Sequence, residues 1–190
     1  MRTKRQVLFV QGAGKGVHDD WDGKLVENLR SELGANYEVR YPRMPKEDDP
    51  SYARWKAALE NELAALGDGA ILVGHSLGGT ILIHALAENP PKRAAGAIFL
   101  IAAPFIGEGG WHIDGWKPQR ELGAKLPSKV PIYLYHGLSD DTVPPPHAEL
   151  FAHAIPQANL FQVPGRDHQF NNDTSEIADV MKSLAADTAP

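Results

Sequence analysis

The 190-residue sequence contains no cysteine, and this absence excludes several kinds of chemistry. It excludes a disulfide-stabilised fold, a thiol nucleophile, and zinc or iron–sulfur centres held by Cys ligands. Positive charge is also scarce, since 19 Lys and Arg stand against 24 Asp and Glu and the formal net charge is −5. A surface that binds nucleic acid through its phosphates is therefore not expected.

Long hydrophobic runs are missing as well. The longest, residues 94–106, contains Pro104 and is too short for a membrane span. The N-terminal run Val7–Val10 is shorter than the apolar core of a signal peptide. We therefore expect a cytoplasmic protein without a membrane span. The length suits a single domain, residues 1–190, with a full hydrophobic core.

Short apolar runs alternate with amphipathic segments along the chain. The apolar runs are candidate strands: Gln6–Val10, Tyr37–Tyr41, Ala70–Val73, Ala97–Ala102, Val130–Tyr135 and Asn159–Val163. Most are apolar throughout, which is typical of parallel strands covered on both faces. Helical stripes between them include Trp21 and Trp55, which we expect in the core. The pattern predicts a three-layer α/β fold with about six mostly parallel strands and helices on both faces.

A serine flanked by glycines follows the third candidate strand. Gly74-His75-Ser76-Leu77-Gly78 joins this strand to residues 80–87, which are compatible with a helix. A Gly-x-Ser-x-Gly turn between a strand and a helix raises the hydroxyl above the sheet, and a Cβ atom at either glycine would collide with backbone. Ser76 is therefore the candidate nucleophile. His75 is too close in sequence to act as its base, and we interpret it as structural.

A serine nucleophile needs a general base, and the base needs a carboxylate to orient it. On a sheet of this kind the acid and then the histidine follow the serine along the chain. Asp140 and Asp141 both follow the fifth candidate strand, and position alone does not separate them. His168 follows the sixth strand, whereas His147 and His153 fall on a candidate helix. His168 is therefore the candidate base.

These motifs together resemble the α/β-hydrolase superfamily over essentially the whole chain. The residues that carry the resemblance are Gly74-His75-Ser76-Leu77-Gly78-Gly79, His136-Gly137-x-x-Asp140-x-x-Val143-Pro144 and His168. The resemblance implies Asp140 rather than Asp141 as the acid. The short chain is similar to the compact serine hydrolases of the YdeN and retinoblastoma-binding-protein-nine group, which implies a minimal α/β-hydrolase fold without a large cap domain.

The resemblance also implies an oxyanion hole made of two backbone N–H groups. One donor would be Leu77, directly after the nucleophile. The other would come from the loop after the first strand, where Ala13 is the candidate and Gly14 the alternative. The glycine-rich segment 104–129 is interpreted as a surface loop or a short cover over the site. The candidate substrate pocket consists of Gly12, Phe105, Trp111 and Trp116.

The expected function is hydrolysis of carboxylic esters or related small acyl compounds through an acyl-enzyme on Ser76, without cofactor or metal. The alternatives are a non-catalytic protein-interaction module on a hydrolase scaffold, and an acyltransferase or perhydrolase that uses the same three residues. Gly12-x-Gly14-x-Gly16 also suggests a nucleotide cradle, but Val17 occupies the third glycine position of that motif. The groups His18-Asp19-Asp20 and His112-x-Asp114 match no recognised metal-ligand spacing.

Overall fold

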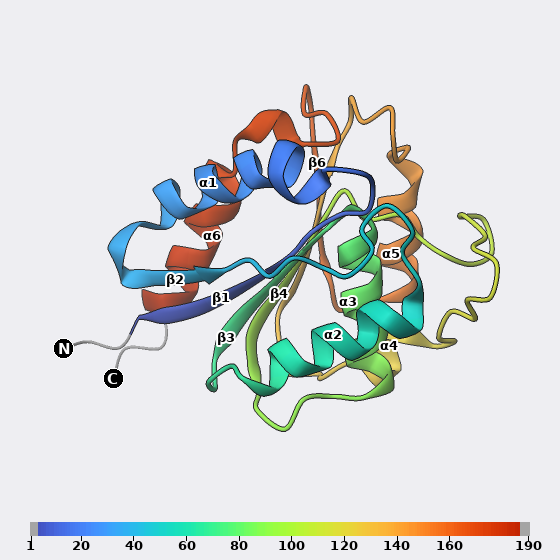
Figure 1. Ribbon diagram of the computed structural model, residues 1–190, viewed down its shortest axis with the longest axis horizontal. Helices are drawn as coiled ribbons and strands as arrows, with labels where there is room; N and C mark the ends of the chain where they lie inside the picture. Colours follow the sequence, from blue (N-terminus) through green and yellow to red (C-terminus); the bar gives the residue numbers. More distant parts are fainter. Residues whose placement is uncertain (1–3, 187–190) are drawn as a thin grey trace.

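The computed structural model describes residues 4–186 and contains a six-stranded sheet in which every neighbouring pair is parallel (Figure 1). The strand order is β2-β1-β3-β4-β5-β6. The strands are β1 (Arg5–Val10), β2 (Tyr37–Arg40), β3 (Ala70–His75), β4 (Ala95–Ile101), β5 (Ile132–Gly137) and β6 (Asn159–Val163). All six predicted strands are present, and the predicted three-layer α/β fold is confirmed.

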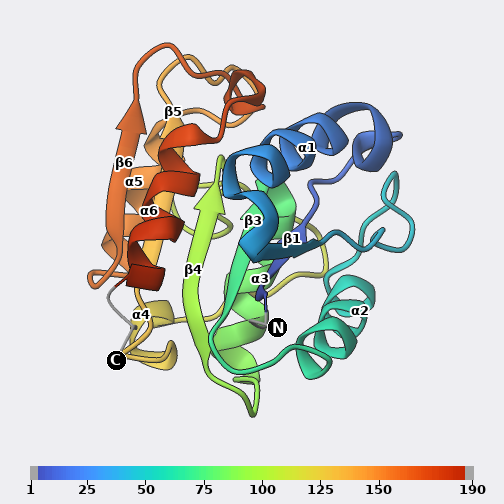
Figure 2. The same ribbon diagram turned by 90° about the vertical axis from the view of Figure 1, so that its left-hand side faces the viewer.

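Helices cover both faces of this sheet, as the uninterrupted apolar strands require (Figures 1 and 2). On one face α1 (Asp22–Leu33) and α6 (Ser175–Ala186) pack on Val7 and Phe9. On the other face lie α2 (Tyr52–Ala64), α3 (Ser76–Glu88), the short α4 (Leu122–Lys125) and α5 (Pro146–Ala154). The core between these helices and the sheet includes Leu8 and Val10. Successive side chains of β1 therefore point alternately into the cores on the two faces.

Three short helical turns complete the described chain: η1 (Val17–Trp21), η2 (Gly34–Asn36) and η3 (Phe170–Asn172). The first of them overturns the prediction that Trp21 is a core residue, because its side chain is 57% exposed. The turn η1 is a π-helix, and α1 begins only after it, so Trp21 does not share the buried stripe of Leu25, Leu29 and Leu33. Trp55, in contrast, is fully buried as predicted.

β1 lies directly beside β3 in the sheet. The strand order reverses between them, because β2 is added on one side of β1 and the later strands are added on the other side. Val10 is in register with Gly74, so the loop that starts at Gln11 leaves the sheet next to Ser76. Crevices at such a reversal, beyond the carboxyl ends of the strands, are where open α/β sheets bind ligands. The topology therefore brings the Gly12–Gly16 loop to the candidate nucleophile.

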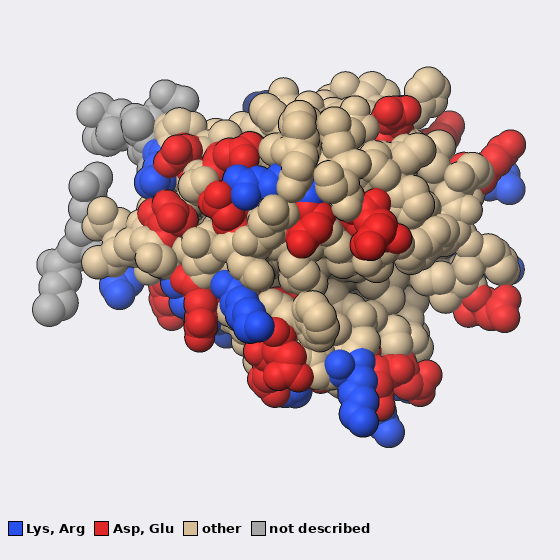
Figure 3. Space-filling view, turned by 90° about the horizontal axis from the view of Figure 1, so that it is seen from above, with Lys and Arg blue, Asp and Glu red and all other residues tan. Residues whose placement is uncertain are grey.

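The surface carries charges of both signs. On the face seen in Figure 3, Lys and Arg side chains lie among Asp and Glu side chains rather than in one continuous basic area. Within residues 4–186, no helix combines the length and the apolar composition that crossing a membrane requires.

Candidate active site

Ser76 lies on a strained turn between β3 and α3. Its φ angle is +50°, in the left-handed region that non-glycine residues rarely adopt. The turn needs both flanking glycines. A Cβ atom on Gly78 would lie 2.0 Å from the carbonyl oxygen of Gln11, and one on Gly74 would lie 2.4 Å from the Cα atom of Gly79. The close packing of the turn against β1 and α3 thus leaves no room for larger residues.

The structure brings Ser76, His168 and Asp140 together from three separate loops. The Ser76 hydroxyl lies 3.1 Å from Nε2 of His168, on the loop after β6. Nδ1–H of His168 donates to Oδ2 of Asp140, on the loop after β5, over 2.9 Å. Asp141, the other candidate acid, is exposed at the rim of the same site. The three side chains therefore form a continuous chain of hydrogen bonds that ends in a buried carboxylate.

Asp140 is held as a carboxylate by its surroundings. Its Oδ1 accepts the backbone N–H groups of Thr142 and Val143, over 2.9 and 2.8 Å. Burial would raise its pKa, but hydrogen bonds from His136, His168 and the Val143 amide lower the pKa well below the usual range for Asp. His136 also donates Nε2–H to the carbonyl of Val143 over 2.8 Å, which fixes the loop around the acid. A charged Asp140 can orient the His168 ring and stabilise its protonated form.

Leu77 and Ala13, the predicted oxyanion donors, line the same cavity as Ser76. Leu77 lies in the first turn of α3, where amides lack a partner within the helix. On the opposite loop, Gly14 already donates its N–H to the carbonyl of Glu47 over 2.7 Å. The N–H of Ala13 has no acceptor among the described residues. Of the two candidate donors on this loop, Ala13 is therefore the one whose N–H is not engaged within the described residues.

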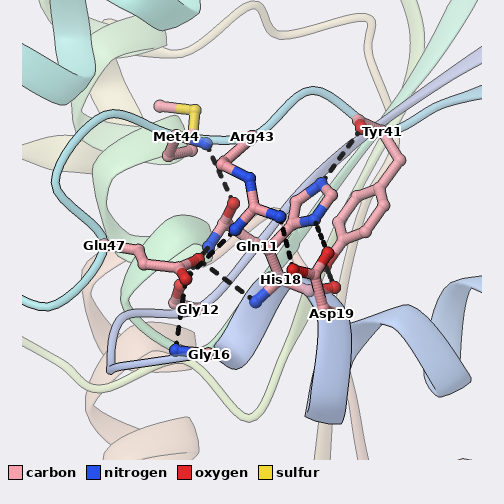
Figure 4. Close-up of polar contacts among 9 residues, drawn as sticks. All are labelled: Gln11, Gly12, Gly16, His18, Asp19, Tyr41, Arg43, Met44 and Glu47. Atoms are coloured by element: carbon pink, nitrogen blue, oxygen red, sulfur yellow. Dashed lines mark hydrogen bonds and ion pairs between the residues drawn. The ribbon is translucent and has the colours of Figure 1, made fainter.

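The side chain of Glu47 shapes this loop (Figure 4). It accepts the backbone N–H groups of Gly16 and His18, each over 3.2 Å, and the side-chain amide of Gln11 over 2.7 Å. Gln11 in turn accepts the N–H of Met44 over 2.9 Å. These contacts fasten the Gly12–Gly16 loop to the segment after β2. Sequence reasoning missed Glu47 because it lies in a charged, proline-broken stretch with no motif.

The sequence also matches a known protein family. The model of the alpha/beta hydrolase family matches residues 7–162, which is most of the chain. The chain belongs to the alpha/beta hydrolase family. This membership supports hydrolase activity for the protein.

Solved structures of similar fold include several hydrolases. The product of the ydeN gene from B. subtilis has a TM-score of 0.75 and 19% identity, over 96% of this chain and 100% of that one. Est1E from Butyrivibrio proteoclasticus has a TM-score of 0.68 and 15% identity, over 98% and 90% of the two chains. XC6422 from Xanthomonas campestris, an α/β serine hydrolase without a lid, has a TM-score of 0.65 and 16% identity, over 100% and 84%. No curated protein sequence matches the chain.

The hydrolase has a cleft of about 500 Å³ at Ser76. Of the predicted pocket residues, Gly12 and Trp111 line it, and the predicted oxyanion donors Ala13 and Leu77 do so as well. The remaining lining residues are Val17, Trp21, His75, Ser76, Pro104, Ile113, Asp141, Thr142, Asp167, His168 and Gln169. Trp111 and Ile113 belong to the glycine-rich segment, which therefore forms part of the wall of the cleft.

Two predicted pocket residues of this hydrolase lie elsewhere. Phe105 and Trp116 line a second, larger cavity beside α4 and α5 rather than the cleft at Ser76. Trp116 is nearly buried because its ring stacks on Tyr52, with centroids 4.7 Å apart. Phe105 packs edge-on against Phe151 at 5.2 Å. Trp21, which the sequence pattern assigned to the core, supplies an aromatic wall of the cleft instead.

Proposed function

We propose that this hydrolase is a serine hydrolase that cleaves carboxylic esters or related small acyl compounds through an acyl-enzyme on Ser76. The observation that carries the proposal is the hydrogen-bond chain from Ser76 through His168 to Asp140, with contacts of 3.1 and 2.9 Å. The contact distances are those that nucleophilic catalysis by a serine requires. The hydrolase family and the serine hydrolase XC6422 among the similar folds support the same class of reaction.

In the first half of the proposed reaction, Oγ of Ser76 attacks the carbonyl carbon of the ester while Nε2 of His168 takes its proton. Asp140 keeps the ring oriented and stabilises the imidazolium. The oxyanion of the tetrahedral intermediate accepts the N–H groups of Leu77 and Ala13. The bond to the alcohol then breaks, and the alcohol leaves with the proton that His168 returns.

The second half repeats these steps with water. His168 removes a proton from a water molecule that attacks the acyl group on Ser76, and the same two amides bind the second oxyanion. Collapse of that intermediate releases the carboxylic acid and restores the Ser76 hydroxyl. An alcohol or a peroxide in place of water would make the same intermediate an acyl donor, and the partitioning of product in the presence of an added acceptor measures that reaction.

The cleft supports small, apolar acyl or alcohol groups. Val17, Trp21, Trp111 and Ile113 give it an apolar wall, while Asp141 and Asp167 lie on its polar side. A cavity of this size encloses small ligands. We therefore expect uncharged, short-chain esters to be better substrates than esters with an anionic acyl group.

The test is the hydrolysis of 4-nitrophenyl esters of increasing acyl length by the wild type and by Ser76→Ala. We expect the variant to lose at least about 10³-fold in kcat, because the serine and its base act as one unit. Ser139→Ala is the matched control, since Ser139 is exposed on the loop that carries Asp140. Retention of most activity by Ser76→Ala, with the fold intact by circular dichroism, would overturn the proposal.

A further inference from the structure

A second histidine–aspartate pair lies buried next to Ser76. His75, the last residue of β3, is 1% exposed, and Asp22, the first residue of α1, is fully buried. Nδ1 of His75 lies 2.9 and 3.0 Å from the two carboxylate oxygens of Asp22. The pair takes no direct part in the proposed reaction, because Ser76 and His168 contact each other without it. A buried charged pair costs desolvation energy, so its contacts call for an explanation.

Each member of the pair also binds the backbone of an active-site loop. Oδ2 of Asp22 accepts the N–H of Gly12 over 2.7 Å, one residue before the proposed oxyanion donor Ala13. Nε2 of His75 lies 2.9 Å from the backbone carbonyl of His168, the proposed base. The pair thus forms one hydrogen-bonded path from the loop that carries Ala13 to the loop that carries His168.

The path needs two protons on the pair. Both ring nitrogens of His75 face oxygen atoms, and a neutral imidazole has a single N–H. The carbonyl of His168 only accepts, so Nε2 must carry a proton, and the contact with Asp22 needs a second proton between Nδ1 and the carboxylate. Burial would lower the pKa of His75, but the charge and the hydrogen bond of Asp22 raise it above its usual value. The two contacts and this direction both favour an imidazolium bound to a carboxylate.

The packing around Gly12 leaves this path little freedom. A Cβ atom on Gly12 would lie 3.1 Å from Cβ of Ser76, 3.4 Å from Nδ1 of His75 and 3.6 Å from Oδ2 of Asp22. The oxyanion loop therefore lies directly against both the nucleophile and the buried pair. A change in either hydrogen bond would shift the loop relative to Ser76.

The geometry points to Asp22 and His75 as positioning residues that hold the oxyanion loop and the His168 loop in register on either side of Ser76. This inference rests on the proposed function. The two loops follow different strands, β1 and β6, and these strands are not neighbours in the sheet. The pair is the direct hydrogen-bonded link between them, and the positions of Ala13 and His168 relative to the reacting carbonyl depend on it. Displacement of a catalytic group by about 1 Å can cost about 100-fold in rate.

The decisive test compares variants that keep or break the links. Asp22→Asn keeps all of them without a charge, because its amide oxygen can accept from Gly12 and its NH₂ can donate to Nδ1 of a neutral His75. His75 can then still donate Nε2–H to the His168 carbonyl. Asp22→Ala breaks the link to Gly12. His75→Asn keeps an amide near the position of Nδ1 and loses the link to His168, and His75→Gln does the reverse.

The measurement is kcat and KM for a 4-nitrophenyl ester, with kcat expressed per serine titrated by a fluorophosphonate, so that unfolded protein does not count. We expect Asp22→Asn to stay within about threefold of wild type. We expect Asp22→Ala, His75→Asn and His75→Gln to lose about 10- to 100-fold in kcat with little change in KM. A role in folding alone would lower the titrated fraction and the melting temperature but leave kcat per titrated site unchanged.

Two results would overturn the inference. If the link-breaking variants that fold keep kcat per titrated site within threefold of wild type, the pair does not position the loops. If Asp22→Asn loses as much as they do, the charge rather than the hydrogen-bonded path is responsible. If Asp22→Ala does not fold, kcat per titrated serine of His75→Asn and His75→Gln tests the inference. Failure of the proposed function is recognised separately, because the wild type would then show no hydrolysis that depends on Ser76.

Discussion

His168 and Asp140, 28 residues apart in the chain, meet through a hydrogen bond of 2.9 Å between Nδ1 and Oδ2. The contact exists because β5 and β6 are neighbouring parallel strands whose following loops leave the sheet at the same edge. The Asp140 carboxylate is buried and accepts hydrogen bonds from two backbone amides, and its pKa lies below the usual range for Asp. It can therefore remain charged while the histidine beside it gains and loses a proton.

The first prediction concerns this acid. We expect Asp140→Asn to lower kcat about 10³- to 10⁴-fold, because an amide no longer stabilises the imidazolium and can select the wrong tautomer of His168. Asp141→Asn is the matched comparison and should lose far less with the same uncharged ester, since Asp141 is exposed at the rim of the cleft and it is Asp140 that contacts His168. Steady-state kinetics with one ester decide it. Equal losses of kcat in the two variants would contradict the assignment of Asp140 as the acid.

The second prediction concerns the loop that carries Ala13. Glu47 binds the amides of Gly16 and His18 and the side chain of Gln11 (Figure 4). We expect Glu47→Ala to lower kcat by about tenfold, less than the 10²- to 10³-fold that typically follows removal of an oxyanion donor, because the Ala13 amide is displaced rather than lost. Asp48→Asn, a change at the exposed neighbouring acid, serves as the control. Unchanged kcat in Glu47→Ala would show that the loop does not depend on this carboxylate.

The third prediction concerns substrate size. Trp21 is exposed and lines the cleft at Ser76, so Trp21→Ala should raise KM for longer acyl chains more than for acetate. The expected ratio of the two effects is about 5- to 10-fold, which corresponds to the loss of one or two buried methylene contacts. Phe161→Ala removes an exposed aromatic side chain outside the cleft and is the control. A uniform change of KM across all acyl lengths would contradict a role of Trp21 in the acyl pocket.

The fourth prediction concerns acid stability. Burial lowers the pKa of His84, on α3, to about 4, against an ordinary value of 6.5. The unfolded chain therefore binds more protons than the folded one between these values, and the free energy of unfolding falls as the pH drops from about 6.5 to 4. The contribution of His84 to this loss is about 3 kcal/mol.

Urea unfolding at several pH values tests it. In His84→Asn the amide oxygen can still accept the N–H of Gln119, which donates to Nδ1 of His84 in the wild type. The variant should be less stable at pH 7, but its free energy of unfolding should fall less steeply toward pH 4. Parallel curves for the two proteins would show that His84 does not titrate between pH 4 and 7.

The fold, and the meeting of Ser76, Asp140 and His168 at one edge of the sheet, could be predicted from motifs and strand order. Six apolar runs predict the strands, and the Gly-x-Ser-x-Gly turn fixes Ser76 between a strand and a helix. The order of acid and histidine then follows from the topology of the sheet. The resemblance to hydrolases selected Asp140 between two adjacent acids, and the structure places that residue, not Asp141, against His168.

The supporting contacts could not be predicted because they join segments that carry no motif. Asp22 and His75 are 53 residues apart, and Glu47 meets Gly16 across 31 residues. Trp21 was misassigned because the helical stripe was extended back by one residue into a π-helical turn. Trp116 was predicted to line the substrate pocket because it falls on no helical stripe, whereas Tyr52 and His84 pack against its ring. Such contacts depend on tertiary packing rather than on local pattern.

The central claim is that Ser76 becomes acylated, and trapping the covalent adduct tests it most directly. The protein is treated with a fluorophosphonate or quenched in acid during turnover of a 4-nitrophenyl ester, and the modified peptide is mapped by mass spectrometry. We predict one adduct, on the peptide that contains Ser76, with no adduct in Ser76→Ala and a strongly reduced rate of labelling in His168→Ala. Hydrolysis that depends on the protein but leaves Ser76 unmodified, or an adduct on another residue that persists in Ser76→Ala, would contradict the account.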